Sequence, residues 1–285
     1  MHDVSTFSSI DDLLADNRRP NAHNYSGDAH TRSERGSSHK WYMTDTYEDS
    51  VTLATDGWSE IRPKVDAIAA PIRERLSARF DTAPDRSYDV CGSLVDVAQY
   101  MSGEPECMVS FLPQPERAGG KVVRLLVNIV APASTSADTL MRRGVTVLAL
   151  AEAIEMVGGS CEVVIGFGVN GSGGKQRRNT LDIITTVKSA TETPDTDRIL
   201  YALGHPSMMR RQMFAVCAKL TPEQVTAMGY DQYGHGLGGC RDVDAERAEA
   251  DLVIGYGSAE TARMVNDPEA WVIEQLRGLG FEVRD

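Results

Sequence analysis

Apolar and polar residues follow one another in ordered blocks between residues 121 and 167. Residues 122–130 are rich in Val, Leu and Ile, which is typical of a buried central strand. A serine-containing loop comes next, and apolar residues then recur every three or four positions, the helical period, as far as Gly158. Residues 162–167 form a second apolar run. The pattern therefore predicts a strand–helix–strand unit.

The first part of the chain is predicted to be mainly helical. Residues 9–14 begin with serine and two aspartates, which indicates a short capped helix. Residues 61–80 carry apolar side chains at helical spacing after a Ser59 cap, and Pro71 is expected to kink or split this helix because proline lacks the N–H donor. Residues 18–40 contain almost nothing to bury, so we expect an extended arm that becomes ordered on a partner.

A change of composition near residue 118 suggests a domain boundary. Residues 88–108 mix the two periods and allow no assignment, and the proline and glycine pairs at residues 113–120 resemble a linker. We expect residues 1–118 to form an arm and helical region that packs on the core, and residues 119–285 to form an α/β domain. The expected fold class is three-layer α/β, with a mostly parallel central sheet and flanking helices.

One glycine-rich segment resembles a motif found in nucleotide-binding proteins. Gly166, Gly168 and Gly171 match the Gly-x-Gly-x-x-Gly fingerprint, but that motif requires a helix at its third glycine, and residues 181–187 predict another strand. We therefore favour a glycine-rich hairpin. The remaining pattern predicts helices at residues 196–203, 206–220 and 271–279, a capping box at 221–224, a mobile loop at 229–239, and strands at 252–256 and 281–283.

Composition restricts the classes of function. The chain has 285 residues, of which 41% are hydrophobic and 25% charged, and its net charge is -12. No apolar run is long enough to span a bilayer and no secretory signal is visible at the start, so we expect a soluble cytoplasmic protein. Five cysteines at irregular spacing predict reduced thiols. The negative charge disfavours a non-specific nucleic-acid binder unless a local basic patch overrides it.

Two groups of basic residues could supply such a patch. Lys175, Arg177 and Arg178 lie in the predicted hairpin, and Arg210 and Arg211 lie on a later predicted helix. Together they would form a site for an anion or a nucleic acid. The alternative is an ordinary solvated turn, since no aromatic residues for base stacking are interleaved with the hairpin.

No catalytic constellation is visible in the sequence. The serines lack the Gly-x-Ser-x-Gly elbow of a hydrolase, so a triad has no anchor. His235 and Cys240 provide only two of the four ligands that zinc usually takes, and the histidines of the arm have no regular spacing. We therefore expect no enzyme activity and no cofactor.

The strand, serine loop, long helix and second strand resemble the opening of a von Willebrand factor A-like domain. This resemblance implies a metal motif, Asp-x-Ser-x-Ser, at the end of the first strand. Here Ser134 and Ser136 are present but Pro132 replaces the aspartate, so a divalent cation would need Asn128 or Asp138 as an additional oxygen ligand. The alternative is that the two serines only cap the helix.

A second resemblance covers most of the chain. It is carried by residues 7–14, Trp41, Gly57, Trp58, and residues 103–108, 123–147, 203–206 and 209–211. In these segments the chain is similar to a protein family encoded by tailed bacteriophages, which implies a setting and no mechanism.

The two resemblances together suggest a function. They favour a non-enzymatic protein that mediates assembly or scaffolding through the A-like domain and the arm. It would bind a protein partner or form a homo-oligomer, in the cytoplasm of the infected host or in the virion, without a membrane. The alternative is a nucleic-acid-associated replication or transcription factor that acts through residues 175–178.

Overall fold

The computed structural model describes residues 1–19, 39–79, 86–90, 94–111, 120–230, 239–281 and 283. Most of the predicted arm, and His235 in the predicted mobile loop, lie outside these residues. The structure contains a main sheet and a small separate one. The strands of the main sheet are β1 (His2–Phe7), β5 (Val122–Asn128), β6 (Ser160–Asn170), β7 (Thr180–Lys188), β8 (Cys240–Arg241) and β9 (Leu252–Ile254).

The main sheet is mixed, with the order β1-β7-β6-β5-β9. β1 is parallel to β7, and β5 is parallel to both β6 and β9. β6 and β7 form an antiparallel hairpin, and β8 pairs with β6 beyond the point where β5 ends. The predicted strand–helix–strand unit is confirmed as β5, α6 (Ala137–Met156) and β6.

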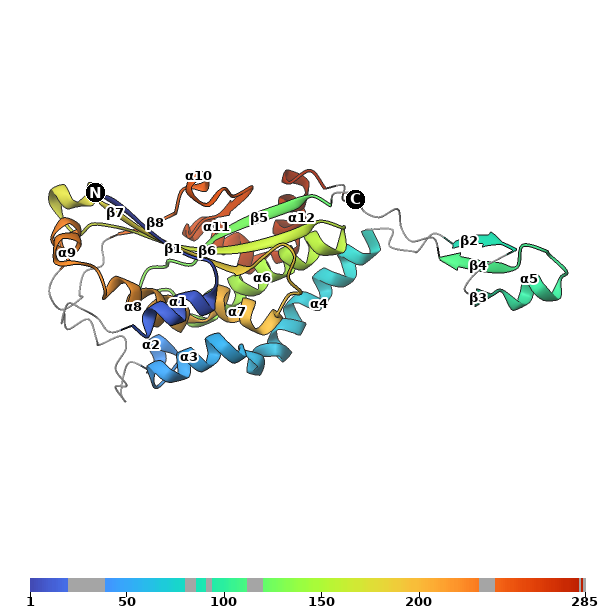
Figure 1. Cartoon of the computed structure of the whole chain (residues 1–285), viewed down its shortest axis with the longest axis horizontal. Coiled ribbons are helices and arrows are strands. Elements are labelled where there is room, and N and C mark those ends of the chain that lie inside the picture. The colour runs from blue at the N-terminus through green and yellow to red at the C-terminus, as the bar shows by residue number, and fades with distance from the viewer. Residues whose placement is uncertain are drawn as a thin grey trace.

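Helices and helical turns make up most of the remainder of the described chain (Figure 1). The α-helices besides α6 are α1 (Ile10–Asn17), α2 (His39–Tyr42), α3 (Tyr47–Asp56), α4 (Arg62–Arg79), α5 (Val97–Met101), α7 (Thr196–Gly204), α8 (Phe214–Cys217), α9 (Pro222–Met228), α10 (Ala245–Ala248), α11 (Ser258–Asn266) and α12 (Pro268–Gly278). Two 3-10 turns, η2 (Ser59–Ile61) and η3 (Gly174–Arg178), and one π-helix, η4 (Met208–Met213), complete the set.

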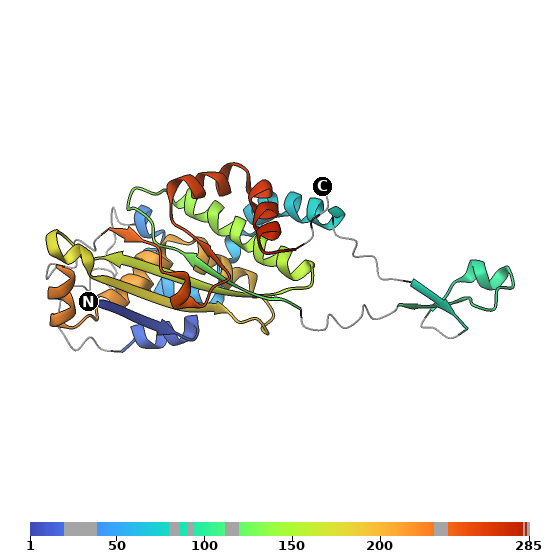
Figure 2. The ribbon, with the colours of Figure 1, turned by 90° about the horizontal axis from the view of Figure 1, so that it is seen from above.

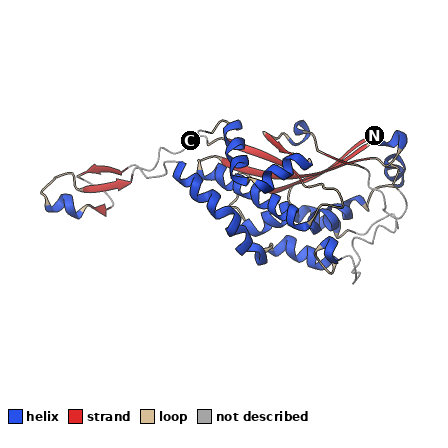
Figure 3. Ribbon diagram, turned by 180° about the vertical axis from the view of Figure 1, so that it is seen from behind, coloured by secondary structure: helices blue, strands red, loops and turns tan. Residues whose placement is uncertain are grey.

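The two faces of the main sheet are covered unequally (Figure 3). Side chains alternate between faces along a strand, so Leu125 and Ile165 face the large core that includes α6 and α7. α4 packs on α6 and α3 packs on α7, which adds a further helical layer on this side. On the other face Leu126 and Val164 form a small core with Ala248 of α10. The predicted three-layer α/β class, with a mostly parallel sheet flanked by helices, is confirmed.

The helices α6 and α7 touch backbone to backbone at one crossing. A Cβ atom on Gly144 of α6 would lie 2.8 Å from the Cα atom of Gly204 in α7. A Cβ atom on Gly204 would lie 3.3 Å from the Cα atom of Met141, so the contact is closest at Gly144, where α7 leaves no room for a side chain. This crossing brings α7, and the chain that follows it, directly against the helix of the serine loop.

β1 is a strand that the sequence pattern did not predict. It pairs in register with β7 from His2 opposite Thr180 to Phe7 opposite Thr185. The first residues of the chain therefore lie in the same sheet as the strands of the expected α/β domain. The expected boundary near residue 118 stays a prediction.

The separate sheet contains β2 (Arg86–Asp89), β3 (Leu94–Val95) and β4 (Met108–Phe111), in the antiparallel order β2-β4-β3. We call the described residues 86–90 and 94–111, which include α5, the projecting unit. Figure 1 and Figure 2, which view the molecule from two perpendicular directions, show it standing away from the body. The sequence pattern left this region unassigned.

Several expected elements differ from those observed. α4 runs unbroken through Pro71, so the expected split is wrong; the proline is exposed, while Val65 and Ile72 are buried and anchor the helix in the core. Ser59 begins the turn η2 and does not cap α4. The helix expected to reach residue 220 ends at Cys217, and the described residues 281 and 283 are not in a strand.

Candidate functional site

The serine loop, residues 131–136, links β5 to α6 at the carboxyl end of β5. Ser136 caps α6, because its Oγ accepts a hydrogen bond from the Thr139 amide at 3.1 Å. Asp138 is exposed and pairs with Arg142 of the same helix. The capping role is therefore confirmed for Ser136, while Ser134 is exposed on the loop.

Asn128, the other candidate metal ligand, faces away from this loop. Its side chain is fully buried, and its Oδ1 accepts a hydrogen bond from the Val243 amide at 2.8 Å. Its oxygen thus holds the segment between β8 and α10 against the sheet. In the described part of the chain, no group of three or more His, Cys, Asp or Glu residues is arranged to hold a metal ion. Of the two candidate oxygen ligands beside the serines, Asn128 contacts Val243 and Asp138 contacts Arg142.

Gly166 and Gly168 lie inside β6, so the nucleotide fingerprint is wrong and the hairpin is confirmed. A Cβ atom on Gly168 would come within 2.6 Å of the carbonyl oxygen of Arg241. On Gly166 it would lie 3.0 Å from Oδ1 of Asn128 and 3.1 Å from Val243. These glycines let the segment from β8 to α10 cross closely over the sheet, and no phosphate-binding helix follows them.

The two groups of basic residues that were expected to form one patch lie in different surroundings in the structure. Lys175, Arg177 and Arg178 are exposed together on η3. Arg210 and Arg211 are only 2% and 1% exposed, so they cannot join a surface patch, and that part of the expectation is wrong. Both arginines lie on η4, which is enclosed by neighbouring elements, so even consecutive polar residues are buried there.

Arg210 and Arg211 act as internal anchors, and we call this pair the arginine anchor. Arg210 donates to the carbonyl oxygens of Trp41 at 2.6 Å and Thr135 at 3.1 Å, and its guanidinium stacks on the Trp41 ring at 4.7 Å. Since Thr135 belongs to the serine loop, Arg210 ties this loop to α2. The anchor therefore connects the carboxyl end of β5 with the segment next to the predicted arm.

Arg211 completes the anchor on the other side of η4. Its Nε donates to Thr44 Oγ1 at 2.7 Å, its Nη2 donates to the Thr44 carbonyl oxygen at 3.0 Å, and its guanidinium stacks on Tyr42 at 4.2 Å. Burial lowers the pKa of both arginine side chains. The oxygen acceptors and aromatic faces that surround these cations take the place of water.

A buried histidine lies at the start of the same region. His205 Nδ1 accepts hydrogen bonds from the Ser207 amide at 3.1 Å and from Ser207 Oγ at 2.8 Å, and the ring packs edge-on against Trp58. A serine–histidine pair can serve hydrolysis, but Ser207 is fully buried, so a substrate has no access to its hydroxyl. Burial lowers the pKa of His205 to about 3. This pair is structural.

The free energy of unfolding should fall as the pH drops below 6.5. Folded His205 has a pKa of about 3 against 6.5 for a free side chain, so between these values only the unfolded state takes up the proton. The stability contributed by the neutral ring is complete above pH 6.5 and is lost toward pH 3. Each pH unit costs about 1.4 kcal/mol, or roughly 2 kcal/mol between pH 6.5 and pH 5.

Urea unfolding at pH 7 and pH 5 measures this effect. His205→Gln removes the titrating ring, so its loss of stability between the two pH values should be smaller than that of the wild type by roughly 2 kcal/mol. His2→Gln, at an exposed position, serves as the control and should keep the wild-type loss. The same pH dependence in wild type and His205→Gln would contradict the assignment.

Exposed large apolar side chains are concentrated on the projecting unit within the described part of the chain. Six of the ten large apolar side chains that are exposed in the described part of the chain lie on it. Tyr100 and Met101 are 65% and 78% exposed, and both lie on α5. The other four are Tyr88, Val90, Val95 and Val97.

The projecting unit is also acidic. Its described residues include one basic residue, Arg86, and four acidic residues, Asp89, Asp96, Glu104 and Glu106, which gives a net charge of -3. Every residue of the unit whose burial is described is exposed or half-buried. The unit therefore presents apolar side chains among negative charges.

Among the described helices, none combines the length and the apolar character that crossing a bilayer requires.

Comparison with known proteins identifies one family. No curated protein and no solved structure matches the chain. One family model, described as Domain of unknown function (DUF7192), matches residues 2–283, a span that includes both the main sheet and the projecting unit. The chain therefore belongs to the DUF7192 family.

Proposed function

We propose that this chain is a non-enzymatic assembly protein that binds a protein partner through the projecting unit. The observation that carries the proposal is the cluster of exposed apolar side chains on a unit that stands away from the body (Figure 2). Contiguous exposed apolar surface marks interaction sites, and tyrosine and methionine are enriched in protein interfaces. Tyr100 and Met101 are the most suitable contacts because they share one short helix.

The negative charge of the projecting unit indicates which kind of protein it would bind. The projecting unit carries a net charge of -3 and the whole chain a net charge of -12, so a second copy would meet it with like charge. A partner with an apolar centre and a basic rim complements the unit instead. The likeness to tailed-phage proteins supports a partner in the infected host cell or in the virion. The predicted arm would be a second contact, as the sequence pattern suggests.

A pull-down from phage-infected cells tests this function. The double variant Tyr100→Ser/Met101→Ser should recover the specific partner at least about tenfold less than wild type, since central apolar contacts carry most of an interface's binding energy. Val122→Ser, which also removes an exposed apolar side chain but lies on the body, should recover it normally. Equal recovery by the double variant and wild type would refute a role for the unit.

The nucleic-acid alternative rests on the three exposed basic residues of η3. Nuclease treatment separates it from the assembly function in the same experiment. If the recovered material disappears with nuclease, and if Lys175→Ala/Arg177→Ala/Arg178→Ala also abolishes its recovery, the alternative is correct. Retention on single-stranded DNA would then weaken steeply with salt, because phosphate contacts release counterions.

A further inference from the structure

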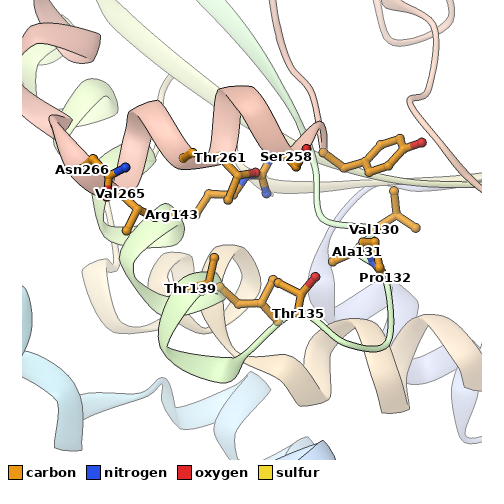
Figure 4. Close-up of a pocket in the computed structure, with 13 residues that line it drawn as sticks. Val130, Ala131, Pro132, Thr135, Thr139, Arg143, Ser258, Thr261, Val265 and Asn266 are labelled. Carbon is orange, nitrogen blue, oxygen red and sulfur yellow. The ribbon is translucent and has the colours of Figure 1, made fainter.

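A cavity of about 460 Å³ lies between α6 and α11, at the carboxyl ends of the neighbouring parallel strands β5 and β9. This volume is in the range of pockets that hold small organic molecules. Ligands of open α/β sheets commonly bind at the carboxyl ends of parallel strands. Figure 4 shows the serine loop and the two helices around the cavity, with Thr139 and Arg143 on α6 and Thr261 on α11.

Arg143 is the charged group of this cavity. It lines the cavity wall although its side chain is only 3% exposed. Its Nη2 donates to the carbonyl oxygens of Gly255 at 2.7 Å and Ile254 at 3.3 Å. Its buried Nε has no hydrogen-bond partner among the described residues. Burial lowers the pKa of Arg143 to about 10, so the guanidinium stays charged at neutral pH, and its two carbonyl contacts use only Nη2 of its three nitrogens.

The start of α11 adds a second feature that favours an anion. This nine-residue helix begins at Ser258 after Gly257; Glu260 lies in its first turn, and no side chain caps its first amides. Uncapped N-terminal amides and the helix dipole favour a negative group. Ser258 and Thr261 also place hydroxyl groups on the cavity wall. The donors therefore come from two helices that face the same space.

The nearby carboxylates have their own partners. Glu260 Oε2 accepts a hydrogen bond from the Gly255 amide at 3.1 Å, and Asp242 Oδ1 accepts one from the Tyr256 amide at 2.9 Å. Both stabilise the charge of Arg143 through space, while the direct hydrogen bonds of Arg143 in the described structure go to backbone carbonyl oxygens. No carboxylate is therefore hydrogen-bonded to the Arg143 guanidinium in the described structure.

We propose that this cavity binds a small amphipathic organic anion. Its carboxylate or phosphate group would accept hydrogen bonds from Arg143 and from the start of α11. Its apolar body would lie against Val130, Leu140 and Val265, which belong to a lining that is mainly apolar. The size of the cavity suits a single small organic molecule.

Isothermal titration of the full-length protein with four probes tests the proposal. Octanoate and octyl phosphate combine an anionic group with an apolar body, octanol has only the apolar body, and inorganic phosphate has only the charge. We expect at least one amphipathic anion to bind at least about tenfold more tightly than both octanol and inorganic phosphate. Which of the two anions binds better then identifies the head group. If neither binds, or if octanol binds equally well, the proposal is wrong.

Variants locate the binding. Arg143→Met keeps the side-chain length and removes the donor, so it should weaken the amphipathic anion at least about tenfold. Since Arg143 is buried and this variant could fail to fold, Ser258→Ala/Thr261→Val provides a second test on partly exposed residues, with an expected weakening of about threefold or more. Thr193→Val, in the 270 Å³ cavity beside β1 and β7, should change nothing. Unchanged affinity in the folded cavity variants would refute this site.

Discussion

Replacing Arg211 with alanine is expected to lower the free energy of unfolding by about 3 kcal/mol or more, because buried acceptors that lose their donor cost about 1–3 kcal/mol and the loss of a large buried side chain adds to this. The Thr44 hydroxyl and carbonyl oxygens would lose their donors in a region closed to water, and Tyr42 would lose the group stacked on its ring. The vacated volume would add a cavity. All three effects raise the free energy of the folded protein and therefore lower the free energy of unfolding.

Urea unfolding compares this variant with two others. Arg142→Ala removes an arginine whose side chain is 47% exposed and paired with Asp138 on the surface, so it should cost less than about 1 kcal/mol. Arg211→Met fills the volume without donating hydrogen bonds, so its effect should lie between the two. If Arg211→Ala costs no more than Arg142→Ala, the arginine anchor does not stabilise the fold.

Replacing Gly144 with valine is expected to cost about 3 kcal/mol, the upper part of the usual range for overpacking. Any Cβ at this position meets the backbone of Gly204 and Leu203 at 2.8 to 3.0 Å. Backbone atoms cannot rotate out of the way as a side chain can, so α6 and α7 would have to move apart. The separation would also disturb the residues that follow α7, including His205.

Alanine variants at two other glycines are compared with Gly144→Ala in the same unfolding experiment. A Cβ on Gly204 would lie 3.3 Å or more from α6, so Gly204→Ala should destabilise less than Gly144→Ala. Gly278, at the end of α12, has open space, and Gly278→Ala should be neutral or slightly stabilising. A similar loss for all alanine variants would mean that helix contact does not explain the effect.

Local patterns were sufficient where one element carries a strong period. The run from β5 through α6 and β6 to β7 was predicted because β-branched strands and a helical stripe follow one another without interruption. The capping box at Thr221 and the serine cap of α6 were predicted for the same reason, since both depend on residues within one turn.

Long-range pairing explains what the sequence could not predict. β1 has polar residues at most positions, and its partner strand lies 178 residues away, so nothing local marks it as a strand. Arg210 and Arg211 were predicted to lie on the surface, although Met209 precedes them and Met213 follows two positions after them. That apolar surrounding was the available signal that the arginines are buried. The cavity beside Arg143 is formed by α11, a helix that was not predicted.

The pairing of β1 with β7 has a consequence for the order of events during synthesis. β1 leaves the ribosome before its partner strand, because the residues it pairs with are added 178 positions later, about 10–40 s at usual elongation rates. During this time it is an unpaired strand, which is the kind of segment that aggregates. Its sequence, His-Asp-Val-Ser-Thr-Phe, contains only two apolar residues. The polar character of β1 therefore protects the nascent chain from aggregation until β7 has been made and the sheet can form.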